Sequence, residues 1–182
     1  MDARAKRRMQ LILVTLLFAA PLLLALILRW EEWRPQRTRN YGELINPPVD
    51  ITAGELTLSD GNNLNLRDAN WRWTLLAFSG PSCEEHCLTA LDQVRRARIS
   101  LNQNADRLRI GYLGAALPGD VLKEFTSLLV AHDPNRYFVN WRPQQADTLA
   151  VALIDPNGQA VLRYPAGFDA NGLRKDVARL IH

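Results

Sequence analysis

The stretch that most constrains this chain of 182 residues runs from residue 71 to residue 91. It opens with an apolar run at 74–78 that has the length of a buried strand, and turn-forming residues follow at 79–82. Both cysteines of the chain, Cys83 and Cys87, come directly after the turn, and apolar residues then recur at spacings of three. The stretch therefore predicts a buried strand, a tight loop and a helix whose first turn presents two thiols.

The Cys-x-x-x-Cys spacing leaves several kinds of chemistry open. On a helix, residues four apart lie on the same face, so Cys83 and Cys87 can form a disulfide after modest adjustment or hold one metal ion between them. They could also be two small buried neighbours. The start of a helix stabilises a thiolate, whereas Glu84 and Glu85 raise the thiol pKa values and a protonated His86 lowers them. A structural zinc ion needs four ligands, and the chain offers no second pair of cysteines or histidines.

Charge is distributed unevenly along the chain. Residues 1–40 hold eight Lys and Arg against three Asp and Glu, and the remaining residues hold 14 basic against 16 acidic side chains. The net charge of +3 therefore arises in the N-terminal part, so it gives no reason to expect a nucleic-acid partner. We also find no glycine-rich phosphate loop and no Cys-x-x-Cys-His sequence, so neither a nucleotide nor a haem cofactor is predicted.

An apolar segment near the N-terminus predicts a membrane anchor. Residues 11–28 carry no charge, and with their flanks they reach the 20 or so residues that cross a bilayer as a helix. The apolar run is longer than that of a signal peptide and lacks a small-x-small cleavage site. We predict a cytoplasmic tail at 1–9, a transmembrane anchor at 10–30, a linker at 31–50 and a globular domain at 51–182. The tight basic cluster before the span places the N-terminus in the cytoplasm and the domain in the periplasm, anchored in the inner membrane.

The rest of the chain alternates between strand and helix patterns. We predict a β-hairpin at 56–66, strands at 71–78, 108–113, 148–154 and 159–164, and helices from the cysteines to about residue 101, at about 121–131 and from Asp169 onward. His132 is expected at the end of the second helix. Trp71, Trp73 and Trp141 are expected to pack in the core or on edge strands, although they could form a docking surface. The order indicates one α/β domain, with a mixed sheet and helices on both faces.

The fold class that we predict is a thioredoxin-like α/β fold with an N-terminal β-hairpin extension, preceded by one transmembrane helix. Within this class the chain resembles the Sco/SenC proteins, which are thioredoxin-fold copper chaperones of cytochrome c oxidase assembly. The resemblance runs from about residue 55 to the C-terminus and rests on four stretches, at 56–66, 78–91, 120–138 and 153–158. It implies a single membrane anchor, a domain outside the cytoplasm, and a respiratory oxidase subunit or its assembly factors as partner.

The chain departs from the Sco/SenC pattern at the copper site. That family binds copper with both cysteines and a distant histidine, which lies eight residues before the aspartate of the hairpin at 153–158. In this chain Asp147 holds that place. Carboxylates are poor ligands for copper(I). His86 could replace the missing ligand, but we expect it to be exposed and unused. The prolines that flank the family's cysteines are replaced by Glu84 and Leu88, and Thr148 and Leu149 occupy the region of the usual thioredoxin cis-proline.

Three functions follow from the residues and the resemblance together. The first is a membrane-anchored accessory protein for oxidase biogenesis, whose Cys83–Cys87 pair reduces, or is reduced by, the copper-site cysteines of a partner. In that exchange Cys83 attacks and Cys87 resolves the mixed disulfide. Such a protein is an assembly factor, or a thiol–disulfide oxidoreductase in the enzymatic sense. The second is copper(I) delivery, with Cys83, Cys87 and a third ligand, from His86 or from a partner, around the metal. The third is a non-catalytic scaffold whose two cysteines form a structural disulfide.

Overall fold

The computed structural model describes residues 3–30 and 40–181, which belong to two compact units, Met1–Thr38 and Arg39–His182. The expected linker residues 31–39 and the terminal His182 lie outside the described residues. The first unit is the helix α1 (Ala3–Trp30), which contains Pro21. Its stretch Lys6–Leu24 is long and apolar enough to cross a membrane.

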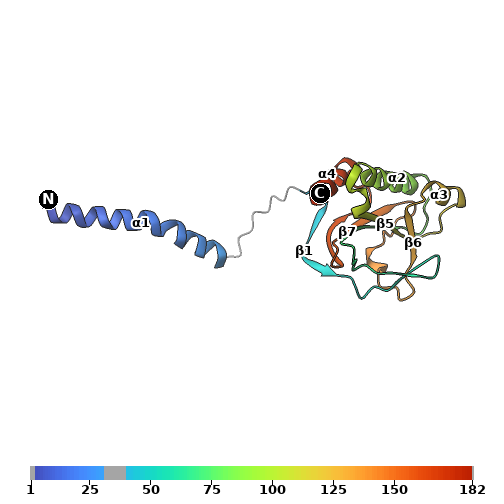
Figure 1. Ribbon diagram of the computed structural model, residues 1–182, viewed down its shortest axis with the longest axis horizontal. Coiled ribbons are helices and arrows are strands. Elements are labelled where there is room, and N and C mark those ends of the chain that lie inside the picture. The colour runs from blue at the N-terminus through green and yellow to red at the C-terminus, as the bar shows by residue number, and fades with distance from the viewer. Residues whose placement is uncertain (1–2, 31–39, 182) are drawn as a thin grey trace. The chain divides into compact units, whose positions relative to one another are not determined.

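The second unit is built on a mixed sheet (Figure 1). The described residues supply eight strands to it, in the order β1-β8-β7-β4-β5-β6-β2-β3. The strands are β1 (Glu43–Asp50), β2 (Leu56–Leu58), β3 (Asn63–Leu64), β4 (Trp73–Ser79), β5 (Leu108–Leu113), β6 (Leu128–His132), β7 (Leu149–Ile154) and β8 (Gln159–Tyr164). The helices are α2 (Glu85–Ile99), α3 (Gly119–Glu124) and α4 (Ala170–Leu180), with short 3-10 turns η1 (Asn102–Arg107) and η2 (Val139–Trp141). The central strand β4 runs parallel to β5 and antiparallel to β7.

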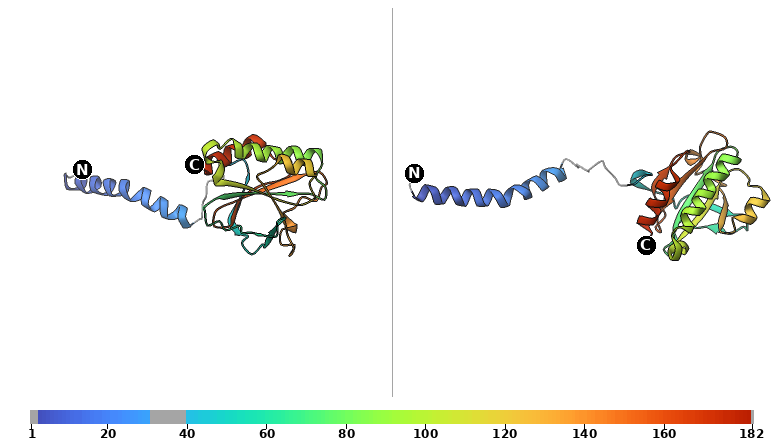
Figure 2. Two further views of the ribbon diagram at one scale, coloured as in Figure 1. Left: turned by 45° about the vertical axis from the view of Figure 1, so that its right-hand side comes forward. Right: turned by 90° about the horizontal axis from the view of Figure 1, so that it is seen from above.

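Residues along β4 point alternately into two cores, as the two-residue period of a strand requires. Leu75 and Ala77 face a core that α2 and α4 cover, and Leu76 and Phe78 face the opposite core. Figure 2 shows α2 and α4 side by side on one face of the sheet. The opposite face is covered by residues 51–66 and by the aromatic side chains near η2. The prediction of helices on both faces is therefore wrong, because loop and edge-strand residues supply the second layer.

The segment Glu43–Asp50, which we assigned to the linker, forms β1 and pairs antiparallel with β8. Its prolines and charges suggested a solvated tether, but a strand at the edge of a sheet tolerates both. The carboxylate of Asp176 on α4 holds the backbone just before β1 in place, since it accepts hydrogen bonds from the backbone N–H groups of Tyr41 (2.7 Å) and Gly42 (2.9 Å). The domain thus begins before residue 51.

The predicted helix at 121–131 is wrong in its second half. The helix α3 ends at Glu124, and Leu128–His132 forms β6, which pairs with β5 on one side and β2 on the other. The apolar residues of this segment have a spacing that suits a helix, but sheet pairing with sequence-distant strands overrides it. His132 consequently ends a strand rather than a helix.

The other predicted elements are confirmed, except that α2 begins at Glu85, so Cys83 lies in the loop before the helix and only Cys87 lies on its first turn. β2 and β3 form the hairpin, and β5 and β8 have the expected bounds. Asp169 is the N-cap of α4, where its side chain accepts from the N–H of Asn171 (2.9 Å). Among the tryptophans, Trp73 and Trp141 pack against the two cores, whereas Trp71 is 69% exposed.

Candidate functional site

The two cysteines lie where the central strand passes into α2. Ser79 ends β4, residues 80–84 form a loop, and α2 begins at Glu85. Cys83 and Cys87 form a disulfide, with their Cα atoms 5.0 Å apart. Cys87 is fully buried, and Cys83 retains 7% of its surface. Of the alternatives that the spacing allowed, the structure therefore has the disulfide.

A second loop, 142–148, fixes the cysteine loop from the side of β7. The N–H of Gly80 donates to the carbonyl of Thr148 (2.9 Å), and the Arg142 guanidinium donates to the carbonyls of Ser79 (3.2 Å) and Gly80 (3.3 Å). A Cβ atom at Gly80 would collide with the carbonyl oxygen of Gln145. Glycine is therefore required at this close approach of two backbones.

Asp147 caps the cysteine helix from this second loop. The N-cap residue Glu84 makes no side-chain capping bond of its own. Instead, Asp147 Oδ1 accepts from the backbone N–H groups of Glu84 (2.7 Å) and Cys87 (3.0 Å), and Oδ2 accepts from the N–H of His86 (3.1 Å). One carboxylate thus satisfies three of the N–H groups that the start of a helix leaves without partners.

His86 completes this arrangement. Its Nδ1 lies 2.9 Å from Asp147 Oδ2, while 87% of its side chain remains exposed. The hydrogen bonds from the Cys87 N–H and its neighbours, together with that of His86, hold the pKa of Asp147 well below its usual range. Conversely, the hydrogen bond and the negative charge of Asp147 raise the pKa of His86 above its ordinary value. The pair is therefore a carboxylate with an imidazolium partner at mildly acidic pH.

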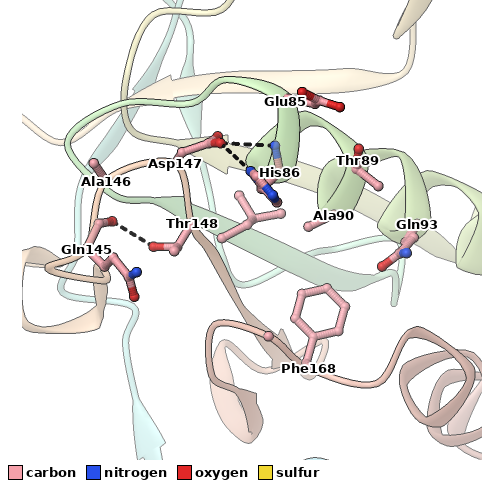
Figure 3. A pocket seen from close by; sticks show the side chains of 12 residues that line it. Glu85, His86, Thr89, Ala90, Gln93, Gln145, Ala146, Asp147, Thr148 and Phe168 are labelled. Carbon is pink, nitrogen blue, oxygen red and sulfur yellow. Dashed lines mark hydrogen bonds and ion pairs between the residues drawn. The ribbon is translucent and has the colours of Figure 1, made fainter.

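A groove of about 500 Å³ lies beside this pair. Its walls are the first two turns of α2 and the loop around Asp147, and the ring of Phe168 faces them from the loop before α4 (Figure 3). Most of the polar side chains along it are uncharged, namely Thr89, Gln93, Gln145 and Thr148.

In the disulfide form that the structure shows, the predicted metal ligands Cys83, Cys87 and His86 are not arranged as a metal site. Among the residues that the structure describes, no three His, Cys, Asp or Glu side chains are grouped so that they could hold a metal ion. His86 Nδ1 contacts Asp147, and the carboxylate of Asp147 is itself occupied by three backbone N–H groups. A hard carboxylate committed to a helix start does not fit copper(I), which prefers thiolate and imidazole ligands.

The structure brings together Cys83, Cys87, His86 and Asp147, all of which the sequence singled out. It also shows what sequence reasoning missed: Asp147 is a capping residue, and His86 is bonded rather than unused. The signal that could have indicated this role is the lack of a Ser, Thr, Asp or Asn at the N-cap position of the cysteine helix. Such a helix start needs an acceptor from another part of the chain.

A strand followed by a disulfide at the first turn of a helix, within this mixed sheet, defines a thioredoxin-like protein. The family described as transmembrane-like, thioredoxin-like, C-terminal domain matches residues 73–182, and the chain belongs to it. The predicted fold class is thereby confirmed. No curated protein matched the sequence of the chain.

Solved structures confirm the likeness to Sco proteins at the level of the fold. The apo Sco1 protein from Thermus thermophilus has a TM-score of 0.59 and 17% identity, over 81% of this chain and 100% of that one. The copper-bound ScoI of Bradyrhizobium japonicum has a TM-score of 0.51 and 17% identity, over 76% and 98%. The copper-bound ScoI of Arabidopsis thaliana has a TM-score of 0.52 and 16% identity, over 76% and 96%.

Proposed function

We propose that this protein is a membrane-anchored, Sco-like accessory factor that acts by thiol–disulfide exchange in the biogenesis of a respiratory cytochrome c oxidase. The observation that supports it most is the Cys83–Cys87 disulfide at the start of α2, directly after the central strand. The fold shared with the Sco structures supports the oxidase as the destination. The apolar helix α1 supports a membrane anchor. The basic residues before the span favour the inner membrane, with the N-terminus in the cytoplasm and the domain in the periplasm.

The exchange begins from the reduced protein. The thiolate of Cys83, the more exposed cysteine, attacks one sulfur of a partner disulfide, and the other partner sulfur leaves as a thiolate. Cys87 then loses its proton and attacks the sulfur of Cys83, which releases the second partner thiolate and forms the disulfide seen here. The partner gains two electrons and two protons, and this protein loses them. A dithiol donor must reduce the Cys83–Cys87 disulfide before the next cycle.

Copper(I) delivery is the alternative function that the likeness to Sco proteins suggests. The copper-bound ScoI structures show that copper is compatible with the fold. In this chain, however, the position of the expected histidine holds Asp147, which caps α2. The observed contacts therefore favour redox exchange with the partner over copper delivery.

A double variant, Cys83→Ser with Cys87→Ser, tests the proposal in cells. We expect the amount of assembled oxidase in the membrane to fall to the level of cells that lack the protein. The matched control is Ser59→Ala, which removes an exposed hydroxyl of the same domain and leaves both thiols in place. Near-UV circular dichroism of the purified variants shows whether the domain is folded. Normal oxidase assembly with the folded double variant would contradict the proposal and favour a scaffold with a structural disulfide.

A further inference from the structure

The feature behind this inference is the site that Asp147 occupies. A helix start normally stabilises a nearby thiolate, because its free N–H groups and positive end favour negative charge. In this protein the N–H groups of Glu84, His86 and Cys87 donate to the Asp147 carboxylate. One of these groups belongs to a reactive cysteine itself. The stabilising contacts are therefore already used, and a fixed negative charge lies 3.0 Å from the backbone nitrogen of Cys87.

We propose that Asp147 is a positioning residue that makes the Cys83–Cys87 pair reducing, because its carboxylate takes the helix-start N–H groups away from the thiolate. A dithiol whose thiolate is well stabilised favours the reduced form, which makes the disulfide a strong oxidant. A dithiol without that stabilisation gives up its electrons more readily. This inference rests on the proposed function, since it concerns the direction in which the same pair exchanges electrons.

The surroundings of the pair reinforce the effect of Asp147. Glu84 and Glu85 flank the site with two further exposed carboxylates. His86 bears the one basic side chain between the cysteines, and its Nδ1 is directed at Asp147 (Figure 3). Its positive charge is consequently offset by the partner carboxylate. The direction of electron flow that follows is from this protein to a partner disulfide, with reduction of the partner's cysteines as the outcome.

The test is the redox equilibrium of the full-length protein in detergent. The wild type and Asp147→Asn are equilibrated with mixtures of reduced and oxidised dithiothreitol, and the oxidised fraction is read from alkylation and mass. We choose about pH 8.5, where an ordinary cysteine is about half ionised and the equilibrium responds to thiolate stabilisation. Asparagine keeps the size of the side chain and one acceptor oxygen but removes the charge.

We expect the reduced form of Asp147→Asn to be favoured three- to tenfold more than in the wild type, which corresponds to about 15 to 30 mV. Iodoacetamide should also modify Cys83 faster in the reduced variant. The matched control is Asp169→Asn, which neutralises a capping aspartate at α4 in the same domain. It should leave the equilibrium unchanged within twofold. Asp147→Gln is the second neutral variant, and it decides the question if Asp147→Asn does not fold.

The results distinguish this inference from the proposed function. If the wild-type disulfide does not exchange reversibly with dithiothreitol, both are wrong. If it exchanges and the folded neutral variants match the wild type, only the role of Asp147 is wrong. An equal shift in Asp169→Asn would also overturn that role, because it would show a general effect of losing a helix cap.

Discussion

The hydroxyl of Ser79 gives the sharpest stability prediction, because it joins the end of β4 to the loop after β5. Ser79 is fully buried, and its Oγ accepts from the N–H of Ala115 (2.7 Å) and donates to the carbonyl of Gly80 (3.1 Å). Ser79→Ala removes both bonds and leaves the Ala115 N–H without its acceptor. The cysteine loop begins at the next residue, so the change acts directly on the support of the site.

The Ala115 N–H is part-buried, and a donor that loses its acceptor in such a place costs about 1 to 3 kcal/mol. For a domain of this size, that loss lowers the melting temperature by roughly 3 to 10 °C. The matched control is Ser59→Ala, since the exposed hydroxyl of Ser59 makes only a long contact of 3.4 Å with the carbonyl of Val130. Removing it should change stability by no more than about 0.5 kcal/mol.

Thermal unfolding of the oxidised, full-length protein, followed by near-UV circular dichroism, measures both variants under one condition. The reasoning is refuted if Ser79→Ala melts within about 1 °C of the wild type, or if Ser59→Ala falls as far as Ser79→Ala. Either result would mean that the hydroxyl of Ser79 contributes nothing specific to the junction of β4 and the cysteine loop.

Three further predictions use the same unfolding assay or a titration. Asp176→Ala leaves the N–H groups of Tyr41 and Gly42 without their acceptor, so it should destabilise the domain by about 2 to 4 kcal/mol. A change below about 0.5 kcal/mol would mean that Asp176 does not hold β1 in place. Because the pKa of His86 is raised in the folded protein, its bond to Asp147 adds stability that is fully present below about pH 6.5 and is lost as the pH rises through the folded pKa. The wild type should therefore exceed His86→Gln in melting temperature at pH 5.5 and match it at pH 9, and a constant difference would argue against the pair. In a titration with a competing chelator, the fully reduced protein should bind copper(I) no more tightly than an isolated dithiol; tight one-to-one binding would show that the metal site has been misjudged.

Local patterns were sufficient for the elements whose ends carry strong turn signals. The hairpin of β7 and β8 follows from two apolar runs around the turn at Asp155 and Gly158, where Gly158 has a positive φ of 85°. The strand β4 and the cysteine helix were predictable for the same reason, since dense turn residues separate a five-residue apolar run from a helical spacing. The fold class followed from the order of these elements.

The elements that sequence reasoning missed depend on partners far away in the chain. β6 exists because β5 and β2 supply hydrogen bonds to both of its edges, although the same residues have a helical spacing. β1 exists because β8 offers it an edge to pair with and Asp176 holds the backbone that leads into it. Neither contact can be recognised from the local sequence. The assignments of residues 128–131 to a helix and of residues 43–50 to a linker were therefore wrong.

The candidate site was predictable in its residues but not in their roles. The spacing of Cys83 and Cys87 allowed the disulfide without deciding it. Asp147 drew attention only as a departure from a family pattern, and its contact with the N–H of Cys87 spans 60 positions. Capping from a distant loop depends on how two loops meet at the end of a sheet, which the sequence does not state.

The measurement that tests the central claim most directly is trapping of a mixed disulfide between this protein and its partner. Cys87→Ser keeps the attacking thiol of Cys83 but cannot resolve the intermediate, so membranes that contain this variant should accumulate a partner joined to Cys83 by a bond that reductant cleaves. Cys83→Ser should accumulate none. If neither variant forms a mixed disulfide while both domains are folded, the Cys83–Cys87 pair does not exchange with a partner, and the account is contradicted.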